Sequence, residues 1–133
     1  MNTAIDFATP ADLEAMADLL AELFTLESDF QPERGKQLRG LRLILENPQI
    51  GRLFVLRVDN QVAGMANALI TISTAEGCTV LLLEDVIVKA KYRGQKLGRC
   101  LVEHVLDWAR DNGMPRVTLL ADKDNSPTLA FYE

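Results

Sequence analysis

The residues that could do chemistry are concentrated where an apolar segment gives way to a short basic segment with glycines. Residues 83–88 read Leu-Glu-Asp-Val-Ile-Val, and residues 92–99 read Tyr-Arg-Gly-Gln-Lys-Leu-Gly-Arg. A strand that runs through such a loop into a helix directs unpaired N–H groups at one place, where the helix dipole favours negative charge. The pattern predicts a phosphate cradle made of backbone. A strand-to-helix connection with glycines for tight packing is the alternative interpretation.

The predicted cradle differs from two common nucleotide loops, because neither G-x-x-x-x-G-K-S/T nor G-x-G-x-x-G occurs in the chain. Residues 83–101 instead resemble the acetyl-CoA-binding motif of the GNAT superfamily of N-acetyltransferases, Q/R-x-x-G-x-G/A. In that register Arg93 opens the motif, Lys96 stands at its first glycine and Gly98 closes it. The lysine can add charge toward a pyrophosphate or obstruct its approach. A second segment resembles the superfamily motif N-x-x-A-x-x-F-Y through Asn125, Ala130, Phe131 and Tyr132.

The resemblance implies acetyl-CoA as co-substrate and assigns a set of binding residues. Backbone groups of one strand would follow the pantetheine arm, amides of the loop would hold the pyrophosphate, and one asparagine would contact the cofactor near the pantetheine. In that order these residues are Val86, Ile87 and Val88; Arg93, Gly94, Gln95, Lys96, Leu97, Gly98 and Arg99; and Asn125. The strand of residues 83–88 and the strand that starts at Arg116 would splay apart to admit the cofactor.

Two catalytic residues follow from the same register. Tyr132 would lie beside the cofactor sulfur as general acid, because a phenol of ordinary pKa is protonated at neutral pH. Glu84 would take the ammonium proton, directly or through water. We expect Asp85 to point to the opposite face of the strand, because side chains alternate there. The alternatives are an aromatic anchor for Tyr132 and carboxylates satisfied by their neighbours for Glu84 and Asp85.

Other candidate residues have weaker functional signals. Carboxylates before the second helix would suit a cationic amine if they form a wall of the acceptor site, although a solvated loop is the alternative. These wall residues are Glu27, Asp29, Phe30 and Glu33. Residues 122–133 imitate a calcium loop, but Pro127 stands where that loop needs glycine, so we predict no metal site. His104 is expected at the margin of a helix, and Cys78 and Cys100 as reduced thiols without a catalytic partner.

The elements that must position these residues follow from periodicity. We expect strands at residues 4–7, 53–58, 61–74, 79–88 and 116–121. We expect helices from Thr9-Pro10 to Glu27, around Leu38 to Leu45, from Leu97 to Asn112, and at residues 128–133. Asp59-Asn60 predicts a hairpin turn, and Gly64 a bulge. The fold class is therefore α/β (α+β), with helices that flank a mixed, largely antiparallel sheet with one parallel crossover. The resemblance implies that this sheet is GNAT-like, with splayed central strands.

Length and composition bound the remaining possibilities. The 133 residues suit one domain, 1–133, and 48% hydrophobic residues allow an ordinary core. A net charge of −5 argues against nucleic acid or an anionic membrane as partner, and without a basic leader or a long apolar run we expect a cytoplasmic protein. Family members continue past the tyrosine into a last strand, which we expect to be missing after Glu133. The open sheet edge would be compatible with a homodimer.

The functional prediction is an N-acetyltransferase. It would transfer acetyl from acetyl-CoA to a primary amine of a small molecule or peptide by direct attack in a ternary complex, with no metal. The alternative is a non-catalytic acyl-CoA-binding sensor or partner module, which Lys96 in a glycine position and the short C-terminus would favour. A ligand other than a CoA ester is the third possibility.

Overall fold

A twisted six-stranded sheet forms the centre of the molecule, in the order β1-β2-β3-β4-β5-β6. The computed structural model describes residues 1–26, 33–119 and 129–130. The strands are β1 (Thr3–Phe7), β2 (Gly51–Val58), β3 (Gln61–Ser73), β4 (Cys78–Val88), β5 (Val117–Leu119) and β6 (Leu129–Ala130). Every neighbouring pair is antiparallel except β4 and β5, which are parallel. The predicted mixed, largely antiparallel sheet with one parallel crossover is confirmed.

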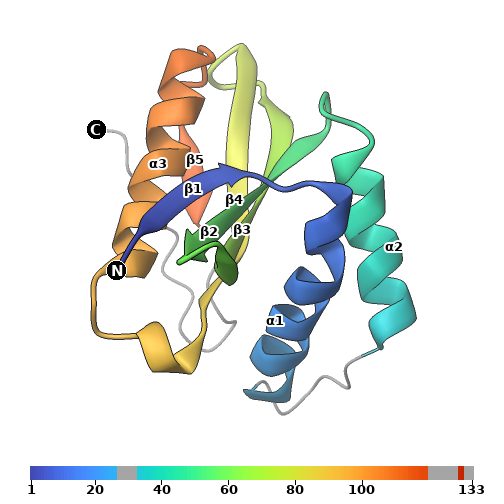
Figure 1. Ribbon diagram of the computed structural model, residues 1–133. Coiled ribbons are helices and arrows are strands. Elements are labelled where there is room, and N and C mark those ends of the chain that lie inside the picture. The colour runs from blue at the N-terminus through green and yellow to red at the C-terminus, as the bar shows by residue number, and fades with distance from the viewer. Residues whose placement is uncertain (27–32, 120–128, 131–133) are drawn as a thin grey trace.

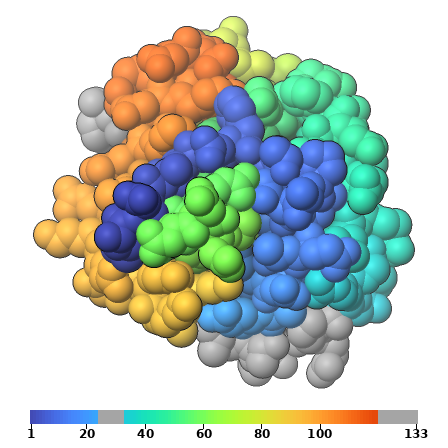
Figure 2. Space-filling view, in the orientation of Figure 1, coloured from blue at the N-terminus to red at the C-terminus, as the bar shows by residue number. Residues whose placement is uncertain are grey.

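Helices cover both faces of this sheet. They are α1 (Leu13–Leu26), α2 (Arg34–Leu45) and α3 (Leu97–Asp111), with short 3-10 turns η1 (Pro10–Asp12) and η2 (Ala90–Tyr92). Figure 1 shows α3 on one side of the sheet and α1 with α2 on the other, and the space-filling view in Figure 2 shows the same division at the surface. None of the helices in the described ranges is long and apolar enough to cross a membrane.

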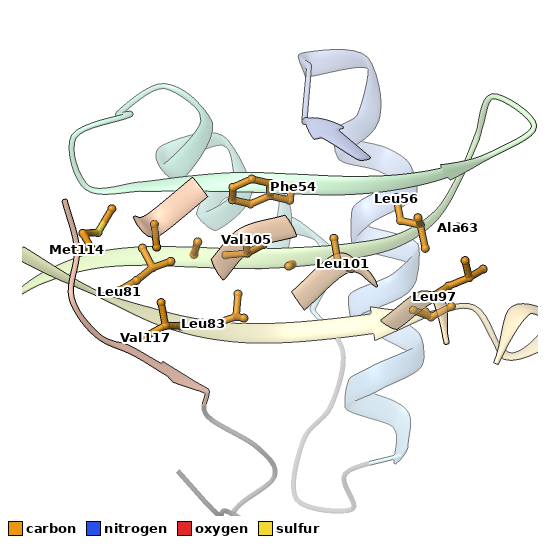
Figure 3. Close-up of a cluster of buried hydrophobic side chains, with 14 of the residues drawn as sticks. Phe54, Leu56, Ala63, Leu81, Leu83, Leu97, Leu101, Val105, Met114 and Val117 are labelled. Carbon is orange, nitrogen blue, oxygen red and sulfur yellow. The ribbon is translucent and has the colours of Figure 1, made fainter. Parts of the chain in front are cut away.

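The two faces of the sheet bury two separate apolar clusters. Under α3, Leu101, Val105 and Ala109 pack on Phe54, Leu81, Leu83 and Val117, all of them buried (Figure 3). Under α1 and α2, Met16, Ala17, Leu20 and Leu41 pack on Leu53, Val55, Met65 and Ile87. The positions 101, 105 and 109 repeat every four residues, which places them on one face of a helix. Burial on both faces explains why β4 is almost continuously apolar.

The start of α1 is tied to the sheet by a buried ion pair. Asp12, only 5% exposed, accepts two hydrogen bonds from the Arg57 guanidinium at 2.9 and 2.8 Å and one from the Thr9 N–H. The Arg57 guanidinium holds the pKa of the Asp12 carboxyl below its usual value, against the opposing effect of burial. The pair therefore fixes the direction in which the chain leaves β1 and enters α1.

Two local expectations need correction or extension. Leu129 and Ala130 are strand β6, paired with Leu119 and Thr118, so the predicted helix at residues 128–133 is wrong at these two positions. Pairing with the edge of β5 outweighs the local cap-plus-proline signal. Helix α2 begins at Arg34, before the predicted apolar stripe, and the Arg34 guanidinium pairs there with Glu14 at 2.6 Å.

The described strands contain two register shifts. One lies next to the bulge expected at Gly64, and the other was not expected. Between β2 and β3 the register shifts after Leu56, so that the extra residue is Ala63, next to the predicted Gly64. Gly64 has its own reason to lack a side chain, because a Cβ there would lie 2.9 Å from the Ile87 carbonyl oxygen. A second shift, between β3 and β4, occurs after Met65 and falls inside the candidate site.

Candidate functional site

A cleft opens where β4 ends and α3 begins. It has a volume of about 370 Å³ and is lined by Val88, Tyr92, Arg93, Gly94, Lys96, Leu97 and Gly98. Six of these seven residues were predicted to bind the cofactor, and Tyr92 was not. Gln95 and Arg99 lie on the same loop and first helical turn but do not line the cleft. The sequence therefore located the cleft, and the fold assembles it from one contiguous segment.

The backbone of this segment offers a row of free donors. None of the N–H groups of residues 94–99 has a hydrogen-bond acceptor among the described residues, whereas the Arg93 N–H is used by the Ala90 oxygen at 3.2 Å. The first turn of α3 closes only at the next residue, where the Cys100 N–H donates to the Lys96 oxygen at 3.1 Å. Within the described part of the chain, no side chain caps this helix. Free amides at the positive end of a 15-residue helix are the elements of an anion site.

Two residues turn the chain through left-handed conformations to expose those amides. Gly94 has φ of +82° and Lys96 φ of +62°. A lysine in this region costs about 1–2 kcal/mol, which a glycine avoids. Lys96 is exposed, and its ammonium group has no ion-pair partner in the described ranges. The position that departs from the superfamily motif thus keeps the glycine-like backbone and adds an unpaired positive charge.

Arg93 connects the cleft to the rest of the fold through its side chain. Its Nε donates to the Val88 carbonyl oxygen at 3.0 Å, and its Nη2 lies 3.3 Å from Glu22 Oε1 on α1. The guanidinium therefore joins the end of β4, the cleft loop and α1. Glu22 was not singled out from the sequence, where it is one of several charged residues on an amphipathic helix and carries no distinguishing signal.

A cluster of three polar side chains lies on β3 and β4, and its two carboxylates precede Val88 of the cleft along β4. Asn67 of β3 pairs in register with Glu84 of β4, and its Nδ2 donates to Asp85 Oδ2 at 3.3 Å. Met65 pairs with Ile87, so Asp85 and Val86 together face a single residue of β3. This arrangement is a β-bulge, and Asp85 adopts a left-handed φ of +55° within it.

The bulge overturns the expectation that Asp85 points away from Glu84. Side-chain alternation holds from Leu81 to Glu84 but is interrupted by the inserted residue. Burial raises the pKa of the Glu84 carboxyl above its ordinary value, and the neighbouring Asp85 charge raises it further. Burial also raises the pKa of the Asp85 carboxyl, while the hydrogen bond from Asn67 lowers it in part. Two carboxyl groups of raised proton affinity therefore lie side by side.

Six of the predicted site residues are not part of the cleft or the polar cluster as described. Tyr132, Asn125, Glu27, Asp29 and Phe30 lie outside the described residues. Glu33 precedes α2 and pairs with Lys36 at 2.9 Å on the surface.

The remaining single candidates occupy ordinary positions. His104 is exposed, with its ring 5.8 Å from that of Phe54. Cys78 and Cys100 are free thiols. In the part of the chain that the structure describes, no group of three or more His, Cys, Asp or Glu side chains could hold a metal ion.

Comparison with known proteins agrees with this geometry. The family model of the acetyltransferase (GNAT) family matches residues 13–133, nearly the whole chain. The chain belongs to the GNAT family. The resemblance seen in the motif around Gly98 is confirmed.

Similar proteins show how far this GNAT chain extends. It is 29% identical over 111 residues to the uncharacterized N-acetyltransferase YobR of Bacillus subtilis (strain 168), covering 84% of the chain and 41% of that protein. The chain thus spans less than half the length of this curated relative.

Solved structures share the GNAT fold. A possible acetyltransferase from Clostridium difficile 630 superposes with a TM-score of 0.84 at 18% identity, over 94% of this chain and 83% of that one. A predicted acetyltransferase with acetyl-CoA from Clostridium acetobutylicum superposes with a TM-score of 0.74 at 12% identity, over 92% and 82%. At these identities the superpositions establish the fold.

Proposed function

We propose that this chain binds acetyl-CoA in the cleft at the start of α3 and transfers the acetyl group to a primary amine of a small molecule or peptide. Attack is direct, in a ternary complex. The observation that carries the proposal is the row of N–H groups at residues 94–99, which have no acceptor among the described residues. They lie at the positive end of a helix, beside a lysine that has no ion-pair partner there either. A pyrophosphate needs such donors, and the family supplies the acyl-CoA context.

The described residues fit the cofactor on two further counts. A Cβ on Gly98 would occupy the cleft and meet only the Val88 side chain, at 3.6 Å, so the glycine leaves room for a phosphate close to the helix axis. The described pairing of β4 with β5 ends at Leu83, while β4 continues to Val88. Backbone groups of Val86, Ile87 and Val88 are therefore proposed to follow the pantetheine arm as an added strand would.

The chemical step needs a neutral amine, a donor for the developing oxyanion and a proton for the thiolate. The thioester of acetyl-CoA supplies the acetyl group. Glu84 accepts the ammonium proton, a task that its raised pKa favours, and the Val86 N–H is the proposed oxyanion donor. Tyr132 is the proposed acid and Asn125 a cofactor contact; for both, the support is the sequence register of the second motif.

The acceptor site is proposed to lie on the side of the sheet that α1 and α2 cover. Its support is the charge of the segment before α2, where Glu27, Asp29 and Glu33 surround Phe30 in the sequence. Such carboxylates attract a cationic amine. The proposal does not choose between polyamines, aminoglycosides, amino acids and peptide N-termini.

Calorimetric titration tests the binding half of the proposal. Acetyl-CoA, desulfo-CoA and adenosine diphosphate are titrated against the wild type, Gly98→Ala and Gly40→Ala. Gly40→Ala is the matched control, because its Cβ meets nothing within 4 Å and lies on α2. We expect Gly98→Ala to lose affinity for all three ligands and Gly40→Ala to keep it. Absence of binding to the wild type would overturn the cleft assignment.

Turnover tests the catalytic half. Tyr132→Phe is expected to lower amine-dependent thiol release while the affinity for acetyl-CoA stays close to wild type, because the phenol donates a proton but holds no phosphate. Unchanged turnover would remove Tyr132 as the acid. Binding without thiol release for any amine would favour the acyl-CoA sensor.

A further inference from the structure

Asn67 is a polar residue in a buried, otherwise apolar stretch of β3, residues 62–70. It is 6% exposed, and its neighbours Met65, Ala66 and Ala68 on β3 are fully buried. A buried amide costs free energy unless it is hydrogen-bonded, so its presence there needs a reason. Its Nδ2 donates to Asp85 Oδ2 at 3.3 Å, and its Oδ1 has no hydrogen-bond partner among the described residues. The side chain is half satisfied, and the satisfied half is directed at a carboxylate.

The position of Asn67 is set by the bulge in β4. Asn67 pairs in register with Glu84, and its side-chain amide donates to Asp85, so one residue is the neighbour of both carboxylate-bearing residues. Asp85 is held in a left-handed conformation that L-residues adopt at a cost, and such a conformation persists only where the surroundings determine it. The bond from Asn67 is the side-chain contact that holds the Asp85 carboxylate there.

The charges around these carboxylates leave the amide as their main support. β3 and β5 carry no ionisable side chain. On α1, Glu14 and Asp18 pair with Arg34, and Glu22 pairs with Arg93. The charged residues of α3 lie across the sheet, where Arg99 pairs with Glu103 and Arg110 with Asp107. In the described ranges, no cation is paired with Glu84 or Asp85.

We propose that Asn67 is a positioning residue of the acetyl-transfer reaction. It holds the Asp85 carboxylate in the bulge beside Glu84, so that the two carboxylates act as one proton-accepting pair for the incoming amine. This role rests on the proposed function. It accounts for the buried amide, the strained Asp85 backbone and the placement of both carboxylates on one side of the sheet.

The protons balance as follows. An N–H bond of the substrate ammonium breaks and its proton goes to Glu84, while Asp85 stays ionised beside it and strengthens its affinity for that proton. The freed lone pair forms the N–C bond to the acetyl carbon as the C–S bond breaks. The thiolate takes a proton from the acid, Tyr132, and the second amine proton restores that acid. One proton then leaves Glu84 for solvent.

The free Oδ1 gives Asn67 a second use. A half turn about the terminal torsion exchanges Oδ1 and Nδ2, and the amide then accepts a hydrogen bond from a protonated Asp85. An amide serves both protonation states of the pair, which a lysine or arginine could not do. This explains why the position carries an asparagine although a cation would hold a carboxylate more strongly.

Two substitutions test the role with opposite signs. Asn67→Leu keeps the size of the side chain and removes the donor, so the pair holds its proton more tightly and the acidic limb of the kcat profile moves to higher pH. Asp85→Asn removes the neighbouring charge, so the limb moves to lower pH. Ser73→Ala is the control: Ser73 is also a buried polar residue on β3, and its hydroxyl accepts a hydrogen bond from the Glu76 N–H instead of contacting a carboxylate. We expect kcat to fall about tenfold in Asn67→Leu, as for the loss of a hydrogen bond to a charged group.

The readouts are the pH profile of kcat with an accepted amine, the carbon-13 carboxyl titrations of Glu84 and Asp85, and the affinity for acetyl-CoA. A general packing defect would lower activity without shifting the acidic limbs of the two variants in opposite directions, and would overturn the positioning role. Unshifted limbs and unshifted carboxyl titrations in both variants would overturn the positioning role. If Asn67→Leu does not fold, Asp85→Asn and its titration decide. Absence of acetyl-CoA binding by the wild type would overturn the proposed function instead, and the carboxyl titrations still report whether the pair exists.

Discussion

Substitutions at Lys96 separate fold stability from cofactor binding. Its left-handed backbone lowers the stability of the fold, whereas its positive charge is expected to strengthen binding of the cofactor. The residue has φ of +62° at the start of α3, where the superfamily motif has glycine. Replacing it by glycine relieves about 1–2 kcal/mol of left-handed strain. The greater freedom of glycine in the unfolded chain takes back about 0.4–1 kcal/mol. Lys96→Gly is therefore expected to stabilise the fold by about 0.5–1 kcal/mol, or about 2–4 °C in Tm for a chain of this size.

The same substitution should weaken the binding of acetyl-CoA. The exposed ammonium has no ion-pair partner in the described ranges and lines the cleft beside the free amides. An exposed charge pair contributes at most about 1 kcal/mol, so we expect acetyl-CoA to bind about fivefold more weakly, with the difference shrinking as salt is added.

Two further variants separate the two effects. Lys96→Asn removes the charge and introduces a residue that tolerates the left-handed region. It should therefore lower the affinity for acetyl-CoA as Lys96→Gly does, and relieve part of the backbone strain. Lys36→Gln removes one positive charge on α2, on the other side of the sheet from α3, and should leave binding unchanged. Thermal unfolding and calorimetric titration at two ionic strengths are the assays. A lower Tm for Lys96→Gly, or unchanged affinity in both Lys96 variants, would refute the reasoning.

Three other substitutions have defined outcomes. Glu84→Gln should lower turnover and should raise or preserve the stability of the fold at pH 7. A carboxyl whose pKa is raised in the fold stabilises it below the unfolded pKa, and this stability is lost as pH rises through the folded pKa. Chemical denaturation between pH 4 and 8 measures the difference. Gly64→Ala forces a Cβ to 2.9 Å from a main-chain oxygen of β4 and should cost about 1–3 kcal/mol, whereas Gly40→Ala on a helix should gain about 0.5–1 kcal/mol; equal urea midpoints would contradict this. Asp12→Asn should cost about 1.5–3 kcal/mol at pH 7, because Arg57 loses its charged partner in η1 and keeps only the pair with Asp6. The difference from wild type should vanish as acid protonates the Asp12 carboxyl, whose pKa is lowered in the fold, and a difference that persists in acid would contradict the assignment.

Local signals in the sequence predicted the elements that depend on local conformation. Asp59 and Asn60 both have positive φ, 51° and 69°, as the hairpin signal requires. Helix α3 follows the predicted apolar stripe, and its start falls at Leu97, one residue after the left-handed Lys96. The candidate cleft was predictable for the same reason, because a single contiguous segment builds it.

Features that depend on pairing between distant segments were not predictable in this way. The bulge at Asp85 arises from how β4 meets β3, and nothing in residues 83–88 distinguishes an inserted residue from an alternating one. The helix expected at residues 128–133 gave way at Leu129 to pairing with β5. Asn67 did leave a signal, since it is a lone amide inside a buried strand, but its meaning appears only when Asp85 lies against it.

The most direct test of the central claim is a thiol-release assay with acetyl-CoA and a panel of amines, followed by mass spectrometry of the amine. The account predicts thiol release that depends on the amine, one acetylated product per thiol released, and loss of the signal in Glu84→Gln. Tight binding of acetyl-CoA with no thiol released for any amine, or release at the same rate without an amine, would contradict it.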